Sequence, residues 1–253
     1  LHPILHSFPT RRSSDLGRPI QHKKEVSTSY TISSELVKAI DRNLTKLAQF
    51  SSKFAETIRI ILDTPKNKAL VYCEYVNGSG CILFAKILEQ FGFTQAFGNE
   101  RSKGLRYALL THQTTTQKSV QRIINRFNMD DNVDGEYISV IIGSKIISEG
   151  FTFKNIRQEF IFTPHWNYSE TAQVIARGWR LGSHNTLIAR GDKNIKVKIY
   201  QLVSTPRGTT PSIDLNMYET SEKKDVAMKQ IEHVVKLNAF DCPLTADRNR
   251  ISG

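Results

Sequence analysis

Cysteine is scarce in this chain, and the positions of its cysteines argue against stabilisation by zinc or by disulfides. Three cysteines occur among the 253 residues, at Cys73, Cys81 and Cys242. No two of them form a CxxC pair, and no cluster of histidines and cysteines has metal-ligand spacing. The sequence thus argues against a zinc site and against a disulfide framework, and it fits a protein kept under reducing, intracellular conditions.

Long apolar runs are also missing. A helix needs roughly 20 predominantly apolar residues to cross a bilayer, and no run in this chain approaches that length. Hydrophobic residues nevertheless make up 39% of the sequence, which is enough to build a buried core. We therefore expect a folded protein with no membrane segment and no membrane partner.

Two nucleotide-binding patterns are absent as well. The sequence has no G-x-x-x-x-G-K-[S/T] phosphate loop, and no Asp-Glu-x-His-like magnesium motif follows a predicted strand. The acidic pair Asp130-Asp131 lies in a polar stretch and is predicted to form a turn. These absences exclude a P-loop hydrolase that is complete within this chain.

Acidic residues are fewer than basic residues in this chain. The chain has 35 Lys and Arg residues against 24 Asp and Glu residues, which gives a formal net charge of +11. Such an excess favours encounter with a polyanion such as nucleic acid. A basic but passive surface explains the same count, so charge alone leaves both interpretations open.

The first residues are interpreted separately from the fold. The segment HSFPTRRSSDL, residues 6–16, resembles the translation of a sequencing-adapter oligonucleotide, with a short basic arm as the alternative. We therefore expect residues 1–16 to take no part in the fold and residues 17–33 to form a linker. On this interpretation we expect the chain to be part of a longer protein.

The next segment has the periodicity of helices, and a strand follows it. Apolar residues recur at spacings of three and four over residues 34–64, and the pattern stops before Pro65. The run ALVYCEY (69–75) is typical of a buried strand. The loop NGSG and a helical segment that closes on Gly92 come directly after it, as at the start of a βαβ unit.

Further strands alternate with helices towards the C-terminus. Apolar runs occur at 106–111, 138–143, 158–163 and 197–203, with helical patterns after the first and the third of them. Strands that are apolar on both faces are typical of a parallel sheet covered on both sides. We predict a three-layer α/β domain over residues 65–205, with helical extensions at 34–64 and 206–253. In the last extension, the residues predicted to face the core are Val226, Ile231, Val234 and Val235.

The segment QVIARGWRLGS (173–183) combines a buried-helix pattern with a polar stripe. Gln173, Arg177 and Arg180 fall at i, i+4 and i+7 and so share one helix face. Rigidly held guanidinium groups suit a phosphate, although an ordinary solvated face is the plain alternative. The neighbouring stripe is predicted to pack against the sheet and consists of Ala172, Ile175, Ala176 and Trp179.

A glycine-containing loop precedes this helix. In ISVIIGSKIISEGFTFKNI (138–156), a strand ends at Gly143-Ser144, and Ser148-Glu149-Gly150 follow. Ligands of open α/β sheets gather at the carboxyl ends of the strands, where backbone amides can hold anions. We expect an anion-binding loop here, with an ordinary turn as the alternative.

Together the two segments resemble motifs V and VI of superfamily 2 helicases and translocases. Motif VI there reads Gln-x-x-Gly-Arg-x-x-Arg, and here Gln173, Ala176, Arg177 and Arg180 match it with alanine in place of glycine. KALVYCEYVNGSG stands where motif IV belongs, and TTTQKSVQRIINRF resembles the segment before motif V in Swi2/Snf2-like proteins. The combination is most similar to helicases of nucleocytoplasmic large DNA viruses. This group includes poxvirus-type early transcription factor small subunits and nucleoside triphosphate phosphohydrolases, and the resemblance covers about residues 50–245.

The resemblance implies a second RecA-like domain. In such proteins ATP and Mg²⁺ lie between two RecA-like domains and are held mainly by the first, which would be the N-terminal partner domain in the same polypeptide. The resemblance makes Arg180 the arginine finger, Arg177 its partner and Gln173 a neighbour of the γ-phosphate or the attacking water. The other implied contacts are Glu149 and Gly150 to the nucleotide, and Gly78, Ser79, Ser144 and Lys145 to the phosphates of DNA or RNA. Asn77 and Thr111 are weaker candidates.

Two classes of function remain. The first is the C-terminal half of a nucleic-acid-dependent ATPase, a viral helicase or translocase linked to the transcription machinery and located in the virion or the infected cytoplasm. This chain alone would then be inactive. The second is a non-catalytic nucleic-acid-binding transcription-factor module on the same fold. Retention of the stripe at Gln173, Arg177 and Arg180 favours the enzyme.

The residues predicted to be structural are His165, His184, Tyr72, Tyr75 and Phe84.

Overall fold

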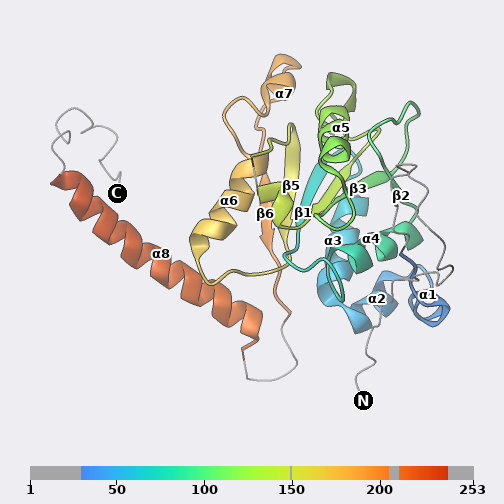
Figure 1. Ribbon diagram of the computed structural model, residues 1–253, viewed down its shortest axis with the longest axis horizontal. Helices are drawn as coiled ribbons and strands as arrows, with labels where there is room; N and C mark the ends of the chain where they lie inside the picture. The colour runs from blue at the N-terminus through green and yellow to red at the C-terminus, as the bar shows by residue number, and fades with distance from the viewer. Residues whose placement is uncertain (1–29, 149, 205–210, 239–253) are drawn as a thin grey trace, which may run out of the picture. The chain divides into compact units, whose positions relative to one another are not determined.

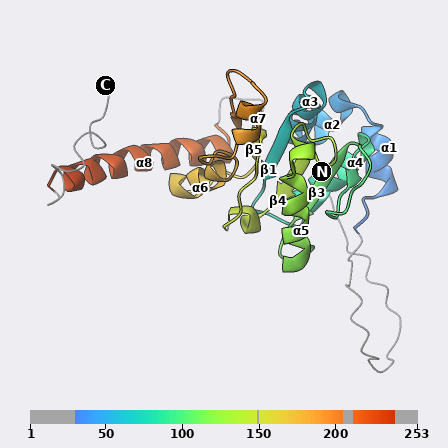
Figure 2. The same cartoon turned by 90° about the horizontal axis from the view of Figure 1, so that it is seen from above.

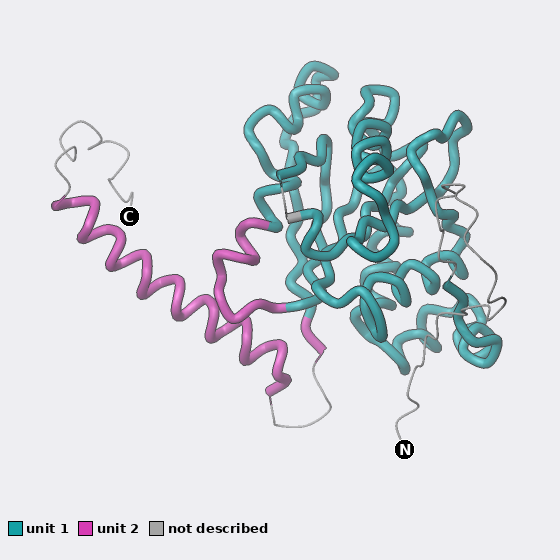
Figure 3. The backbone as a smooth tube through the Cα atoms, viewed as in Figure 1, with its two compact units in different colours: residues 1–163, 174–202 teal, residues 164–173, 203–253 magenta. Residues whose placement is uncertain are grey.

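The computed structural model describes residues 30–148, 150–204 and 211–238, which form two compact units. The first unit comprises residues 1–163 and 174–202, and the second comprises residues 164–173 and 203–253 (Figure 3). The adapter-like segment and residues 17–29 of the predicted linker lie outside the described residues. In the part of the chain that is described, no helix is both long enough and apolar enough to cross a membrane.

A six-stranded parallel sheet forms the centre of the first unit (Figure 1). Its strand order is β2-β3-β4-β1-β5-β6, and every neighbouring pair is parallel. The predicted α/β class is therefore confirmed. The short edge strand β2 was not predicted. The strands are β1 (Lys68–Tyr72), β2 (Thr94–Gln95), β3 (Arg106–Leu110), β4 (Val140–Gly143), β5 (Ile156–Ile161) and β6 (Lys198–Gln201).

Helices connect the strands and cover the sheet. Ser33, Asn43 and Ser51 each accept a hydrogen bond from the first turn of a helix and so fix where the first three helices begin. The helices are α1 (Ser34–Ile40), α2 (Leu44–Phe50), α3 (Ser52–Asp63), α4 (Cys81–Gln90), α5 (Gln117–Phe127), α6 (Tyr168–Gly178), α7 (Asn185–Ala189) and α8 (Ile213–Leu237), with 3-10 turns η1 (Asp130–Asn132) and η2 (Lys145–Ser148).

The sheet separates two apolar cores, which gives the predicted three layers. Ala69 and Val71 of β1 pack into the core that also contains residues of α1 to α4. Leu70 and Tyr72, which alternate with them, join the core formed with α5, η2 and the end of α6. Figure 2 shows α1 to α4 on one side of the sheet and α5 on the other. Because both faces of β1 are covered, its sequence is apolar after the buried Lys68 at its start.

The second unit contains the long helix α8. The prediction that Val226, Ile231, Val234 and Val235 face a core is wrong, because each is 57–63% exposed. The residues of α8 that are buried, Tyr218 and Ser221, lie nearer its beginning. Helical periodicity shows that a helix has an apolar face, but it does not show whether another element covers that face.

Candidate functional site

The end of α6 lies directly on strand β5. Val174 is buried in the core on this side of the sheet, and Gly178 is buried as well. A β-carbon built on Gly178 would overlap the carboxyl group of Glu159 and would lie 3.0 Å from Cγ2 of Ile156. The helix therefore approaches the sheet through its main chain at this point.

The predicted burial of the neighbouring stripe is wrong for three of its four residues. Ala172 and Ala176 are exposed, Trp179 is 64% exposed, and only Ile175 is partly buried. The reason is that Gly178, and not Trp179, faces the sheet. The buried stripe is rotated from the predicted one, and Trp179 is left in solvent between the two arginines of the motif.

Arg180 is held in an exposed position at the end of the helix. Its Nη1 donates a hydrogen bond to Oγ1 of Thr152 at 2.8 Å. The main chain is fixed by Ser183, whose Oγ donates to the carbonyl of Arg180 at 2.7 Å and accepts from its N–H at 3.2 Å. Among the described residues Arg180 forms no ion pair, so its charge is not neutralised there. Thr152 is a functional candidate that the sequence did not indicate.

Arg177 occupies the last turn of α6. Its carbonyl accepts a hydrogen bond from the N–H of Phe153 at 3.1 Å. Burial lowers the pKa of Arg177, and the positive charge of Arg180 lowers it further. The guanidinium of Arg177 therefore feels the charge of Arg180, and it stays protonated because the ordinary pKa of arginine is far above neutral pH.

The other residues predicted to contact the nucleotide are Gln173, Gly150 and Glu149. Gln173 is exposed and belongs to the second unit. Gly150 is exposed with a φ of +74°, a conformation that glycine adopts at no steric cost. Glu149 lies outside the described residues. Their roles stay predictions.

Glu159 is a buried carboxyl group beneath the arginine turn. It is 1% exposed and forms no ion pair among the described residues. Burial raises the pKa of Glu159 to about 8, and the backbone of Gly178 offsets this shift in part. The side chain is therefore mostly neutral at pH 7, which limits the cost of burying it.

The loop assigned to motif V connects opposite edges of the sheet. Ser144 follows the carboxyl end of β4, whereas residues 152–155 lead into the amino end of β5. Asn128, at the end of α5, accepts a hydrogen bond from the N–H of Lys154 and donates one to the carbonyl of Thr152, each at 2.8 Å. The arginine pair thus lies beside the segment that enters β5, and not at the carboxyl edge where the sequence predicted ligands.

The predicted nucleic-acid contacts lie at that carboxyl edge. The loops after β3, β4 and β1 come together there, because these strands are neighbours in the sheet. Gly78 and Ser79 are exposed after β1, and Lys145 is exposed after β4. Asn77 donates a hydrogen bond to Oε1 of Gln113 at 3.0 Å and so joins the loop after β1 to the loop after β3.

Three residues at this edge differ in how well they can reach a ligand. Ser144 is 3% exposed, and Thr111 is fully buried with its hydroxyl hydrogen-bonded to Thr114 at 2.7 Å. Tyr75, by contrast, is 63% exposed, so its predicted packing role is wrong. Its backbone carbonyl accepts from Cys81 at 2.9 Å while its ring remains in solvent. An aromatic ring beside exposed polar loops is suited to stack on a base.

The predicted structural residues otherwise have the expected environments. Tyr72 and Phe84 are buried. The ring nitrogens of His184 lie 2.7 Å from the carbonyl of Ile156 and 2.8 Å from Oγ of Ser183. His165 lies 3.2 Å from Glu170. Asp130 and Asp131 form a 3-10 turn, as predicted.

The fold and the site together define a class of protein. A parallel sheet covered on both sides is a RecA-like α/β domain, and here it has the half-buried Arg177 in the last turn of the helix after β5 and the exposed Arg180 just beyond that helix. The model of the helicase conserved C-terminal domain matches residues 52–182. The chain belongs to this helicase C-terminal domain family.

Individual relatives are viral, which confirms the resemblance seen in the motifs. "Putative helicase 009L" of Frog virus 3 (isolate Goorha) is 48% identical over 205 residues, covering 80% of this chain and 21% of that protein. "Putative helicase 087L" of Invertebrate iridescent virus 3 is 43% identical over 212 residues, covering 81% and 22%. "Nucleoside triphosphatase I" of Heliothis armigera entomopoxvirus is 32% identical over 145 residues, covering 57% and 20%. The chain thus spans about one fifth of the length of these relatives.

Proposed function

We propose that this chain is the C-terminal RecA-like half of a viral nucleic-acid-dependent ATPase, a helicase or translocase linked to transcription. ATP and Mg²⁺ would be held mainly by an N-terminal RecA-like domain of the same polypeptide. Arg180 would then reach the γ-phosphate as an arginine finger, with Arg177 beside it. The family of the chain and the names of its viral relatives support this proposal.

The observation that carries the proposal is the exposure of the Arg180 guanidinium together with the nature of its hydrogen-bond partner. Its guanidinium is exposed and is positioned by a neutral hydroxyl, Oγ1 of Thr152, at 2.8 Å. A carboxylate in that place would neutralise the charge, whereas a hydroxyl positions it and leaves it available. A positioned cation needs little reorganisation when charge develops on a phosphate in the transition state.

Nucleic acid would lie across the carboxyl edge of the sheet. The exposed loops there offer Gly78, Ser79 and Lys145 to phosphates, and the ring of Tyr75 to a base. Phosphate contacts carry no sequence information, so binding would tolerate many sequences and would weaken steeply with salt. The net charge of +11 is consistent with such a partner.

The test is ATP hydrolysis by the full-length polypeptide with and without nucleic acid. Arg180→Ala should lower kcat on the order of 10³-fold or more, as loss of an arginine finger does in other nucleotidases. The matched control is Arg59→Ala, because Arg59 is a surface arginine on α3 that is already paired with Glu56 and Asp63. Unchanged turnover in Arg180→Ala would exclude its role as the finger.

The same assay separates the rival function. A non-catalytic nucleic-acid-binding module would bind DNA or RNA without hydrolysing ATP, even as the full-length protein. Stimulation of hydrolysis by nucleic acid supports the enzyme, and binding with no hydrolysis under any condition supports the module.

A further inference from the structure

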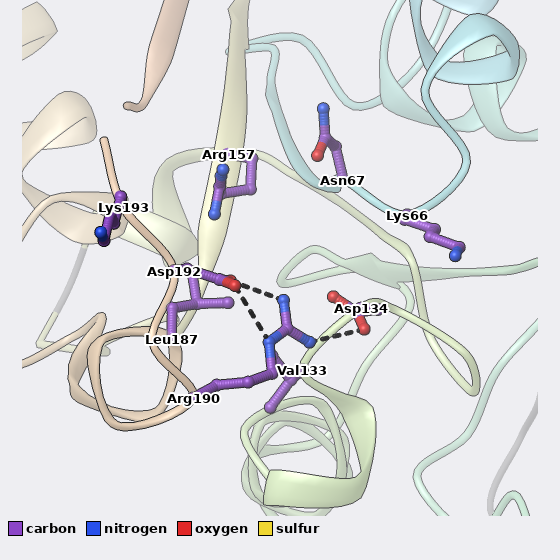
Figure 4. A pocket seen from close by; sticks show the side chains of 9 residues that line it. All are labelled: Lys66, Asn67, Val133, Asp134, Arg157, Leu187, Arg190, Asp192 and Lys193. Atoms are coloured by element: carbon purple, nitrogen blue, oxygen red, sulfur yellow. Dashed lines mark hydrogen bonds and ion pairs between the residues drawn. The ribbon is translucent and has the colours of Figure 1, made fainter. Parts of the chain in front are cut away.

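A polar cavity lies at the amino edge of the sheet in the first unit. Its volume is about 490 Å³, within the range of roughly 300–1,000 Å³ that is usual for small-molecule sites. None of its residues belongs to the arginine pair or to the carboxyl-edge loops. It is lined by Lys66, Asn67, Val133, Asp134, Arg157, Leu187, Arg190, Asp192 and Lys193 (Figure 4).

The topology brings these residues together. Lys66 and Asn67 directly precede β1, and Arg157 is the second residue of β5. Asp134 lies in the segment before β4, and Lys193 in the segment before β6. Because parallel strands all begin at the same edge of a sheet, residues distant in sequence meet there.

The lining is charged, with cations in excess. Four side chains are cationic and two are carboxylates, and only Val133 and Leu187 are apolar. Such a lining disfavours an apolar ligand, because charged groups would lose their hydration without compensation. The oxygen atoms of an anionic ligand would replace the water molecules that these cations lose when the ligand binds.

One cation pairs with both carboxylates, so the cluster of Arg190, Asp134 and Asp192 keeps a formal charge of −1 and the whole lining a formal charge of +2. Arg190 donates through Nη1 to Asp134 at 2.7 Å and through Nη2 to Asp192 at 2.6 Å (Figure 4). These hydrogen bonds raise the pKa of Arg190, and its guanidinium lowers the pKa of Asp192. Arg190 therefore acts as a structural cross-link between the segments that carry the two aspartates.

The other three cations make no direct polar contact in the described part of the chain, although the charge of Arg157 acts on Asp192 and helps to lower its pKa. Within the described residues, the side chains of Lys66, Arg157 and Lys193 form no hydrogen bond or ion pair. Lys66 and Lys193 lie on opposite sides of the Arg190 cluster in the close view, and Arg157 lies between them (Figure 4). Cations on opposite sides of a cavity can bind separate anionic groups of one ligand.

We propose that this cavity binds a ligand with two or more linked phosphates, held by Lys66, Arg157 and Lys193. The planar fork of Arg157 suits two oxygens of one phosphate, and the lysines supply point charges to its neighbours. A single phosphate would fill little of the cavity. The ligand is either a free polyphosphate or nucleotide, or the backbone of a nucleic acid, since both present linked phosphates.

The test measures binding to the 253-residue chain directly. Calorimetric titration with sodium tripolyphosphate tests the free ligand, and fluorescence anisotropy with a labelled single-stranded oligonucleotide tests the backbone. The variant is Lys66→Ala with Lys193→Ala. The matched control, Lys38→Ala with Lys236→Ala, removes the same charge from exposed lysines that do not line the cavity.

The cavity variant should weaken binding of at least one ligand by about tenfold or more, while the control changes it little. Loss of tripolyphosphate binding identifies a free polyphosphate or nucleotide, and selective loss of oligonucleotide binding identifies nucleic acid. Equal affinities in the cavity and control variants would overturn the proposal. It would also fail if Arg180→Ala weakened tripolyphosphate binding as strongly as the cavity variant, because the ligand would then occupy the arginine pair. Failure of the ATPase prediction for Arg180 leaves this measurement unaffected.

Discussion

Gly178 of α6 lies against the carboxyl group of Glu159 in β5, so close that the glycine has no room for a side chain. This contact places the last turn of the helix on the sheet and sets the direction of the residues around it. Arg177 on one side and Arg180 on the other are positioned relative to β5 by this one close approach.

Gly178→Ala should therefore destabilise the fold. The added methyl group would overlap the carboxyl group of Glu159 and would force the helix away from β5. We expect the free energy of unfolding to fall by about 2 kcal/mol, a usual cost of overpacking, in urea denaturation. Gly104→Ala is the matched control, because a β-carbon there would be 3.4 Å from the nearest atoms, which belong to the flexible side chain of Arg106. Equal losses in the two variants would mean that the close approach is not important.

Glu159→Gln should change how stability depends on pH. The pKa of Glu159 is about 8 in the fold, above its ordinary value of 4.5, so the folded state holds the proton more tightly than the unfolded state. Its contribution to stability is fully present below pH 4.5 and declines as the pH rises to about 8. The glutamine variant does not titrate, so its stability relative to the wild type should increase over this window.

We expect that relative gain to be larger at pH 8 than at pH 5, by on the order of 2–4 kcal/mol. Thermal and urea unfolding at the two pH values measure it. Glu35→Gln, at an exposed position in α1, should show no such trend. A pH-independent difference between Glu159→Gln and the wild type would show that the carboxyl group is charged in the fold.

Thr152→Val should impair the arginine finger without removing it. Valine has a similar shape but cannot accept the 2.8 Å hydrogen bond from Nη1 of Arg180. If Arg180 acts on the γ-phosphate, kcat of the full-length polypeptide should fall about tenfold or more, because misplacing a catalytic group is costly. Thr186→Val removes a comparable hydroxyl, which donates to Asp130 at 3.2 Å, and should leave kcat nearly unchanged. Parallel losses of kcat in both variants would indicate a general effect on the fold.

Asn132→Ala should be among the more destabilising single substitutions in the first unit. Its side chain is fully buried and makes four hydrogen bonds to the main chain. These bonds tie the end of α5, at Phe127, to the segment that enters β4, at Ile138. We expect a loss of about 3 kcal/mol, because the variant leaves buried main-chain groups unsatisfied.

The comparison for Asn132 is Asn128→Ala. The side chain of Asn128 makes two such bonds and is only partly buried, so its loss should cost about half as much. Urea denaturation of both variants measures the difference. A smaller loss for Asn132 than for Asn128 would contradict the prediction.

The class of fold was predictable from local patterns. Strand β4, and β1 from Ala69 onwards, are apolar on both faces because helices cover both sides of the sheet, and that burial is visible in the sequence itself. The shared face of Gln173 and Arg177 was also visible, because a helix places residues four apart on one face wherever it packs. These features are set by residues that are close together in the sequence. The prediction that Arg180 continues this helix face is wrong, because α6 ends at Gly178.

Features that depend on which segments meet were decided only by the tertiary structure. The exposure of Trp179 follows from Gly178 packing on Glu159, a contact between residues of two different elements. The separation of Ser144 from Thr152 follows from the strand order, because the chain must cross from the carboxyl edge of β4 to the amino edge of β5. The cavity of Lys66, Arg157 and Lys193 arises in the same way, from strands that are adjacent in space and not in sequence. Local periodicity records how much of an element is buried, whereas the identity of its neighbour is set by long-range packing.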